Sequence, residues 1–192
     1  MINLNHAVKF QHMFWQDQLP KANTIIDATL GNGQDFLFLA QHAAPGAKLW
    51  GLDIQPVALE KSEALLAKQL NRKDVDMQFL LGSHDTLLKT IELPSTGIDL
   101  LIFNLGYLPG GNHELMTHSD TTIKAIEAGL EKLNKDGLIT IVAYPGTAEG
   151  QTECERVKEF LTSLPQRQYD VSTWAPVNQI NNPPVLFIIK GR

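Results

Sequence analysis

The sequence predicts an α/β fold in which seven strands form one mostly parallel sheet with helices on both of its faces. Five short apolar segments alternate with segments of helical periodicity up to Ala143, a pattern typical of parallel strands joined by crossover helices. Two further apolar segments, joined only by a polar, proline-rich loop, predict a closing hairpin with an antiparallel last strand. A glycine turn after the first strand is typical of α/β folds that bind nucleotides.

The size and composition of the chain suit one globular domain. It has 192 residues, of which 43% are hydrophobic and 19% charged, so we expect residues 1–192 to form a single domain with a helix over 1–20 packed on it. No apolar run approaches the roughly 18 residues of a membrane span, and the N-terminus has no secretion signal. We therefore expect a soluble, cytoplasmic protein without a membrane partner.

Charge and cysteine content limit the function further. The net charge of −5 disfavours a general nucleic-acid binder, because such proteins ordinarily present a basic surface. Basic residues are nevertheless concentrated in the last quarter of the chain: Arg156, Lys158, Arg167, Lys190 and Arg192. They could form a local basic patch that binds RNA, or a solvated helix face with a polar tail. The single Cys154 has no catalytic partner nearby in sequence, so we expect it to be incidental.

The elements follow from hydrophobic spacing and from turn residues. Residues 4–19 have an amphipathic helical pattern that Pro20 ends, and His6 and His12 within it are expected to be surface or packing residues rather than metal ligands. The predicted strands are 25–27, 48–53, 77–81, 98–103, 138–143, 169–174 and 185–190. Helices are predicted between the first six strands, at 36–44, 56–71, 84–93, 119–136 and 152–164.

Two helix boundaries are predicted from capping signals. Core-facing residues that include Ile123 and Leu133 recur at intervals of three and four, and Gly137 is expected to end their helix. Thr152 and Glu155 have the spacing of a capping box, which predicts that they begin the next helix.

The stretch 25–36 is the first candidate for a cofactor site. Gly31 and Gly33 provide two glycines of a dinucleotide fingerprint, but Phe36 replaces the third, which argues against NAD and FAD. A phosphate-binding lysine is also missing from this turn. An acidic residue, Asp27, lies at the strand end four positions before Gly31 and suits a cofactor with an ammonium and a carboxylate, such as S-adenosylmethionine.

Two further strand ends are expected to lie at the same edge of the sheet. Asp53 follows the glycine turn by about twenty residues, the spacing of a carboxylate that binds ribose hydroxyls, although it could also cap the helix that begins at Pro56. Ser83 and His84 follow the third strand and would meet the adenine if that strand pairs with the second. Ser83 could equally be an N-cap, and His84 could be structural.

The loop 104–111 is the candidate for the chemistry. Three glycines and a proline give this strand exit a specific shape, and such loops often carry function. The side chain of Asn104 and a neighbouring backbone carbonyl could hold an amine with its lone pair directed at an electrophile. Tyr107 could stack on a flat base. An ordinary glycine-rich connection is the alternative interpretation.

With these motifs, the chain resembles the class I S-adenosylmethionine-dependent methyltransferases, which have a Rossmann-like fold. More narrowly, it resembles a bacterial family labelled "putative rRNA methylase", whose members include the tRNA 5-aminomethyl-2-thiouridine methyltransferase. The motifs that carry the resemblance are 27–35, 104–111 and 178–184, and the resemblance covers nearly the whole chain. Departures from the family pattern are Phe36, the pair Asn112 and His113, and the pair Pro145 and Thr147.

The resemblance implies a role for each matching residue. The implied cofactor ligands are Asp27, Gly31, Asn32, Gly33 and Asp35 for the methionine part, Asp53 and Gln55 for the ribose, and Ser83 and His84 for the adenine. Asn104, Leu105 and Tyr107 would adjoin the transferable methyl group as the catalytic residues, with Asn104 also touching the cofactor. The implied substrate-binding residues are Tyr107, Pro109, Gly110, Asn181, Asn182, Pro183 and Pro184, the last four forming the opposite lip.

The expected reaction is methyl transfer to RNA, at the exocyclic amine of 5-aminomethyluridine or its 2-thio form at the tRNA wobble position, with S-adenosylhomocysteine as product. The alternatives are an rRNA or small-molecule methyltransferase, a nicotinamide-dependent oxidoreductase, and an RNA-binding module without catalysis. No metal site is predicted. The RNA would be held by loops, by the entry helix and by the basic residues of the last quarter. The sequence is compatible with a monomer and with a homodimer.

Overall fold

The computed structural model describes residues 7–108, 110 and 116–192, and every structural statement below concerns these residues. One seven-stranded sheet runs in the order β3-β2-β1-β4-β5-β7-β6. Its strands are β1 (Thr24–Asp27), β2 (Lys48–Asp53), β3 (Asp76–Leu81), β4 (Ile98–Asn104), β5 (Leu133–Ala143), β6 (Tyr169–Trp174) and β7 (Val185–Gly191). The first five strands are parallel, and β7 is antiparallel to both β5 and β6. This confirms the predicted α/β class and the antiparallel last strand.

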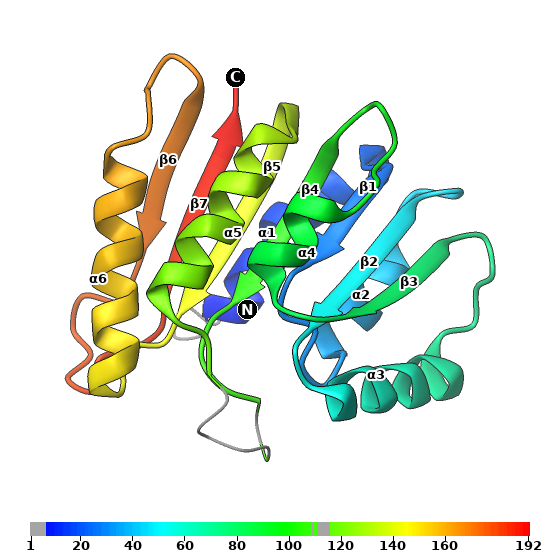
Figure 1. Ribbon diagram of the computed structural model, residues 1–192, viewed down its shortest axis with the longest axis horizontal. Helices are drawn as coiled ribbons and strands as arrows, with labels where there is room; N and C mark the ends of the chain where they lie inside the picture. Colours follow the sequence, from blue (N-terminus) through cyan, green and yellow to red (C-terminus); the bar gives the residue numbers. More distant parts are fainter. Residues whose placement is uncertain (1–6, 109, 111–115) are drawn as a thin grey trace.

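Helices cover both faces of the sheet. The helices are α1 (Ala7–Gln18), the short 3-10 helix η1 (Leu19–Lys21), α2 (Gln34–His42), α3 (Pro56–Gln69), α4 (His84–Thr90), α5 (Ser119–Glu131) and α6 (Ala148–Thr162). Figure 1 shows α4, α5 and α6 in front of the sheet, with α1 and α2 behind it. The described helices include none long and apolar enough to cross a lipid bilayer.

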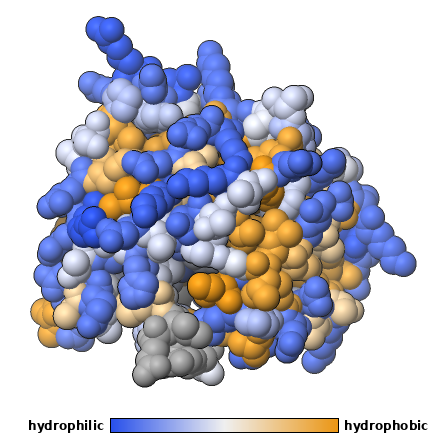
Figure 2. Space-filling view, viewed as in Figure 1, coloured by the Kyte–Doolittle hydropathy of each residue, from blue (hydrophilic) through white to orange (hydrophobic). Residues whose placement is uncertain are grey.

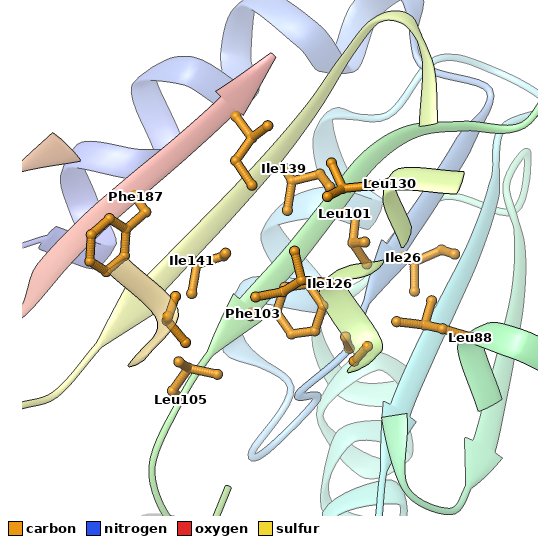
Figure 3. Packing of buried hydrophobic residues seen from close by; sticks show 14 of the residues in the cluster. Ile26, Leu88, Leu101, Phe103, Leu105, Ile126, Leu130, Ile139, Ile141 and Phe187 are labelled. Atoms are coloured by element: carbon orange, nitrogen blue, oxygen red, sulfur yellow. The ribbon is translucent and has the colours of Figure 1, made fainter. Parts of the chain in front are cut away.

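Two apolar clusters fill the spaces between the sheet and its helices. Neighbouring strand residues such as Ile25 and Ile26 are both completely buried but belong to different clusters, because side chains alternate between the faces of a covered parallel sheet. Figure 3 shows the cluster under α4, α5 and α6, where Ile126 and Leu130 of α5 pack on Leu101 and Phe103 of β4.

Two side chains of α1 hold this helix against β4 and β5. The indole Nε1 of Trp15 donates a buried hydrogen bond of 3.0 Å to Oγ1 of Thr140. Nε2 of Gln18 donates to the backbone carbonyls of Asp99 (3.0 Å) and Asp136 (3.2 Å). Because these bonds join the helix to two strands, they fix its position over the sheet.

The prediction that Gly137 ends a helix was wrong. α5 ends at Glu131, and Leu133 already belongs to β5, where it pairs with Ile98. The register is irregular between Ile98 and Leu100, and Asp136 has a φ of 63°. Gly137 is needed at this irregularity, because a Cβ would stand 2.8 Å from the carbonyl oxygen of Asn134.

The predicted capping box was also wrong. α6 begins one turn earlier, at Ala148, and Thr147 caps it by accepting a hydrogen bond of 3.0 Å from the backbone N–H of Gly150. Thr152 lies inside the helix and donates through Oγ1 to the carbonyl of Ala148. Thr147 therefore has the capping role that the sequence pattern assigned to Thr152, because it binds a backbone N–H of the first helical turn.

The surface of the face with α4, α5 and α6 is mostly polar. In Figure 2, apolar side chains gather in the lower right of this face, toward the side where β2 and β3 end in Figure 1. Ile54, just after β2, is 58% exposed, and Leu81 at the end of β3 is 53% exposed. These apolar residues therefore lie at the carboxyl edge of the sheet.

Candidate active site

A cavity of about 590 Å³ opens at the carboxyl edge of the sheet, beside the ends of β1, β2, β3 and β4. Ligands of open α/β sheets bind at this edge. Most of the predicted site residues line the cavity together: Gly31, Asn32, Gly33, Asp35, Asp53, Gln55, Ser83, His84, Asn104, Leu105 and Tyr107. The fold therefore brings residues from four separate strand exits to one place.

Some predicted site residues do not line the cavity. Asn181, Asn182, Pro183 and Pro184 lie in the connection between β6 and β7, where the two asparagines are exposed and the two prolines half-buried. Gly110 is exposed and is not a lining residue. Pro109 and the pair Asn112 and His113 lie outside the described residues. Of the predicted substrate contacts, Tyr107 is thus placed at the cavity.

Asp27 lies beneath the cavity rather than in its wall. Its side chain is buried, with 1% of the residue exposed, and Oδ1 accepts a hydrogen bond of 3.1 Å from the N–H of Thr29. Oδ2 has no hydrogen-bond partner among the described residues. Burial raises the pKa of this carboxyl well above its ordinary value, and the charges of Asp35 and Asp53 raise the pKa further.

The glycine turn brings the start of α2 to the cavity. Gly31 and Gly33 have φ angles of 55° and 76°, and Gly33 is the N-cap residue of α2, without a side-chain cap. The turn packs closely on α3, because Oγ of Ser62 donates to the carbonyl of Gly31 at 3.3 Å. Phe36 points into the core against Phe79, with ring centroids 5.1 Å apart. An uncapped helix start at the cavity presents N–H groups that suit a carboxylate ligand.

Asp53 joins the glycine turn to the start of α3. Its Oδ2 accepts a hydrogen bond of 2.9 Å from the N–H of Gly31, and its Oδ1 accepts one of 2.9 Å from the N–H of Gln55. Gln55, rather than Asp53, is the N-cap residue of α3. The Asp53 carboxylate therefore lines the cavity from a position held by two backbone donors.

Ser83 and His84, which follow β3 in sequence, form part of the cavity wall. Ser83 is the N-cap residue of α4, but its hydroxyl donates to Oδ1 of Asp85 at 2.5 Å and makes no cap bond. His84 is 8% exposed and packs edge-on against Phe103. Burial lowers the pKa of His84, so its imidazole is neutral at pH 7, and Nε2 has no hydrogen-bond partner in the described part of the chain.

Asn104 connects three elements at the centre of the site. Its backbone N–H donates to Oγ1 of Thr29 at 2.6 Å, and its Nδ2 donates to Oδ2 of Asp35 at 2.9 Å. Its Oδ1 accepts a hydrogen bond of 3.1 Å from Nε2 of Gln11 in α1. The side chain predicted to hold the acceptor is therefore bonded to the first turn of α2 on one side and to the N-terminal helix on the other.

The sequence analysis missed the contribution of α1 to this site. His12 was predicted to be a surface or packing residue, and its ring does stack on Trp15 and Phe38, with centroids 4.6 and 4.1 Å away. In addition, Nε2 of His12 lies 2.7 Å from Oδ1 of Asp35. The available signal was Gln11, a polar residue one helical turn before Trp15 and on the same face.

Tyr144 lines the cavity but was not singled out from the sequence. It follows β5, is 39% exposed and lines the cavity with Tyr107, which is 44% exposed. Burial of its hydroxyl, with the charge of Asp35, raises the pKa of Tyr144 to about 12. The phenol is therefore neutral at physiological pH.

Glu153 of α6 holds the segment that follows Asn104. Its Oε2 accepts from Oγ1 of Thr117 at 2.7 Å, and its Oε1 accepts from Oγ1 of Thr122 at 2.7 Å. Oγ1 of Thr117 in turn accepts a hydrogen bond of 2.7 Å from the N–H of Gly106. Glu153 is 3% exposed, and burial raises the pKa of its carboxyl.

Several of the basic residues considered as an RNA patch have acidic partners. Arg156 contacts Asp120 at 2.5 Å, Lys190 lies 3.9 Å from Asp136, and Arg192 pairs with Asp170. These pairs are exposed, so they contribute little to stability, but they reduce the positive charge offered to a phosphate backbone. Cys154, predicted to be incidental, is buried, and burial raises the pKa of its thiol.

Comparisons with known proteins identify relatives of this chain. The family described as "Putative rRNA methylase" matches residues 49–190. A relative from Arabidopsis thaliana, named tRNA (mnm(5)s(2)U34)-methyltransferase, chloroplastic, is 32% identical over 189 residues, which cover 96% of this chain and 69% of the relative.

Two solved structures resemble the whole chain. A putative rRNA-methylase from Clostridium thermocellum superimposes with a TM-score of 0.91 at 33% identity, over 100% of both chains. A putative methyltransferase from Streptococcus mutans, solved in complex with SAH, superimposes with a TM-score of 0.85 at 38% identity, again over 100% of both chains.

Proposed function

This chain belongs to the "putative rRNA methylase" family and is an S-adenosylmethionine-dependent methyltransferase, and from that premise we propose that its acceptor is the exocyclic amine of 5-aminomethyl-2-thiouridine at the tRNA wobble position. The name of the Arabidopsis relative supports this acceptor, since it describes methylation of the modified uridine at position 34 of tRNA. The single observation that carries the proposal is the position of Asn104, which lines the cavity together with the glycine turn and is bonded to Asp35 at the start of α2.

The cavity fits S-adenosylmethionine in size and in chemistry. Its volume of about 590 Å³ is in the range for small-molecule sites. The uncapped start of α2 suits the carboxylate of the methionine part, and the Asp53 carboxylate suits the ribose hydroxyls. The wall with Ser83 and His84 then faces the adenine. When bound, the cofactor supplies a methyl carbon on a positively charged sulfur and leaves as S-adenosylhomocysteine.

The residues around Asn104 have to align the acceptor nitrogen with that carbon. An alkylamine has a pKa near about 10 by analogy with lysine, so it must lose a proton before its lone pair can form the new N–C bond. Removal from water beside a positive charge lowers the pKa of the amine, so a dedicated base is not required. Oδ1 of Asn104 and the carbonyl of Leu105 can then accept the remaining N–H bonds and direct the lone pair.

Positioning accounts for most of the catalysis under this proposal. Well-oriented reactants gain about 7–11 kcal/mol from orientation alone. Tyr107 can stack on the uracil ring, and the neutral Tyr144, which also lines the cavity, can exclude water from it. Both side chains are partly exposed, as a surface that receives a base from a large RNA requires.

The setting of the reaction is part of the same proposal. Residues 1–192 would act as one domain in the cytoplasm, with RNA held by loops at the carboxyl edge of the sheet. Monomer and homodimer are both compatible with this proposal; a homodimer would enlarge the surface that contacts RNA without making its net charge less negative. Sedimentation with and without tRNA tests the dimer: a monomer in both samples contradicts it.

Nucleoside mass spectrometry tests the acceptor. Transfer RNA from cells that lack the protein should accumulate unmethylated 5-aminomethyl-2-thiouridine, and the purified protein with S-adenosylmethionine should convert it in vitro. Ribosomal RNA from the same cells is the matched control. Methyl label that enters rRNA or a small metabolite, but not the tRNA, would contradict the proposed acceptor while leaving the methyltransferase activity intact.

A further inference from the structure

The helix α1 reaches the site with two adjacent polar residues, Gln11 and His12. Gln11 is completely buried, and its Nε2 donates to Oδ1 of Asn104 at 3.1 Å. Nε2 of His12 lies 2.7 Å from Oδ1 of Asp35, whose Oδ2 accepts from Nδ2 of Asn104. The amide of Asn104 is therefore bonded at both ends to groups that α1 supplies or contacts.

These bonds determine which way the Asn104 amide faces. Gln11 offers an N–H and Asp35 offers a carboxylate oxygen, so only the orientation with Oδ1 toward Gln11 and Nδ2 toward Asp35 satisfies both neighbours. A flipped amide would place two N–H donors together and two acceptors together. The same orientation leaves one lone pair on Oδ1 and one N–H on Nδ2 for other partners.

The His12 ring cannot easily move away from Asp35. It stacks on Trp15 with an interplanar angle of 30° and on Phe38 with an angle of 22°. Trp15 and Gln18, on the same helix, are themselves hydrogen-bonded to β5 and β4. The helix therefore holds Gln11 and His12 in fixed positions relative to the strand that carries Asn104.

Burial of Gln11 has a cost that packing alone does not explain. Its Oε1 is buried without a hydrogen-bond partner in the described part of the chain. A buried amide oxygen without a partner destabilises the fold, and a leucine of similar size would avoid this loss. Because Gln11 lowers stability at this buried position, its presence there fits a role at the site better than a role in packing.

We propose that Gln11 and His12 are positioning residues that lock the Asn104 amide in the orientation that receives the acceptor amine. This inference deepens the proposed function and rests on it for the identity of the acceptor. Gln11 acts directly on Oδ1 of Asn104, and His12 acts through Asp35. Neither residue is required to touch the cofactor or the RNA.

Two variants and one matched control test this in the full-length protein. Gln11→Leu removes the hydrogen bond to Asn104, and His12→Phe removes the bond to Asp35 but retains an aromatic ring between Trp15 and Phe38. Each should lower kcat about tenfold or more, because a small displacement of a reacting group is costly. The affinity for S-adenosylhomocysteine and the Tm should stay close to wild type. Gln69→Leu, an identical change at the exposed end of α3, should leave kcat unchanged.

Double variants separate positioning from damage to the fold. In an Asn104→Ala background, Gln11→Leu should have no further effect on kcat, since coupled residues are not additive. A further loss of the same size in that background would overturn the proposal. A fall in kcat that comes with a clear fall in Tm would also overturn it. So would a loss of S-adenosylhomocysteine affinity by the same factor as the loss of kcat.

A second readout does not depend on RNA. With ¹⁵N-labelled asparagine, the side-chain amide signal of Asn104 can be assigned by its loss in Asn104→Ala. It should shift in Gln11→Leu and His12→Phe but not in Gln69→Leu. If this pattern appears while the protein fails to methylate tRNA, the proposed acceptor is wrong and the positioning role stands; unchanged signals in both variants overturn the positioning role, whatever the acceptor.

Discussion

Gly33 in the glycine turn lies so close to Ser62 of α3 that a Cβ added to Gly33 would stand 2.5 Å from the serine Oγ and 2.9 Å from its Cα. Gly33 also has a φ of 76°, a conformation that other residues rarely adopt. The shape of the cofactor turn therefore depends on the absence of a side chain at this position.

Gly33→Ala should destabilise the protein by about 2–4 kcal/mol, the sum of left-handed strain and a steric clash. The matched control is Gly46→Ala, where φ is 81° but nothing lies within 4 Å of the added Cβ, so only about 1 kcal/mol is expected. Thermal unfolding of both variants measures the difference. Equal losses would show that Ser62 moves aside without cost.

Asn104→Ala should lower kcat by about a hundredfold, because the acceptor loses its orienting partner. The Kd for S-adenosylhomocysteine should change by less than about threefold, since the other lining residues remain. Isothermal titration gives the Kd, and methyl transfer to tRNA gives kcat. An equal loss in both quantities would identify Asn104 as a cofactor ligand instead.

Asp53→Asn should weaken cofactor binding by about 10- to 100-fold, since hydrogen bonds to a charged carboxylate contribute about 1.5–3 kcal/mol. The amide oxygen of the variant can accept from the N–H of Gly31 or from that of Gln55 but not from both, so one of these two bonds is lost and the Tm should fall as well. Asp76→Asn, an exposed change at the start of β3, is the control. An unchanged Kd for S-adenosylhomocysteine in Asp53→Asn would exclude the ribose contact.

Glu153→Gln should change how stability depends on pH. Because burial raises the pKa of Glu153 in the folded protein above its ordinary value of 4.5, the folded state holds this proton more tightly than the unfolded state does. The contribution of Glu153 to stability therefore falls as pH rises from about 4.5 through the raised pKa, and then stays constant. Glutamine does not titrate and lacks this dependence.

The Tm of Glu153→Gln relative to wild type should accordingly rise between pH 4 and pH 7. Glu149→Gln, in the first turn of the same helix but exposed, is the control and should follow wild type at each pH. A difference between Glu153→Gln and wild type that is constant across this range would refute the effect of burial.

Local patterns sufficed to predict much of this fold. β2 was predicted at its observed bounds because a Pro-Gly turn precedes it and a proline follows shortly after Asp53. The pairing of β3 with β2, on which the adenine prediction depended, follows from the crossover rule. The end of α5 was missed because the helical spacing of Leu133 continues past the helix, and the pairing with Ile98 that places this residue in a strand is a tertiary contact.

The same limit applies to the site. Gly31, Asp53 and Asn104 could be placed because they follow strands, and parallel strands end at one edge of a sheet. Gln11 and His12 come from a helix whose position over β4 and β5 depends on bonds to Thr140 and Asp99, more than 80 residues away in sequence. No local pattern specifies such contacts, and the identities of the two residues alone do not reveal their role.

The place of β7 in the sheet also constrains synthesis. β6 joins the sheet through β7, which lies between it and β5. During translation, β6 therefore leaves the ribosome before its neighbour exists, and its backbone hydrogen bonds must wait for residues made later. The five parallel strands can assemble first, and the nascent chain would expose the β5 edge to other polypeptides until the final strand arrives.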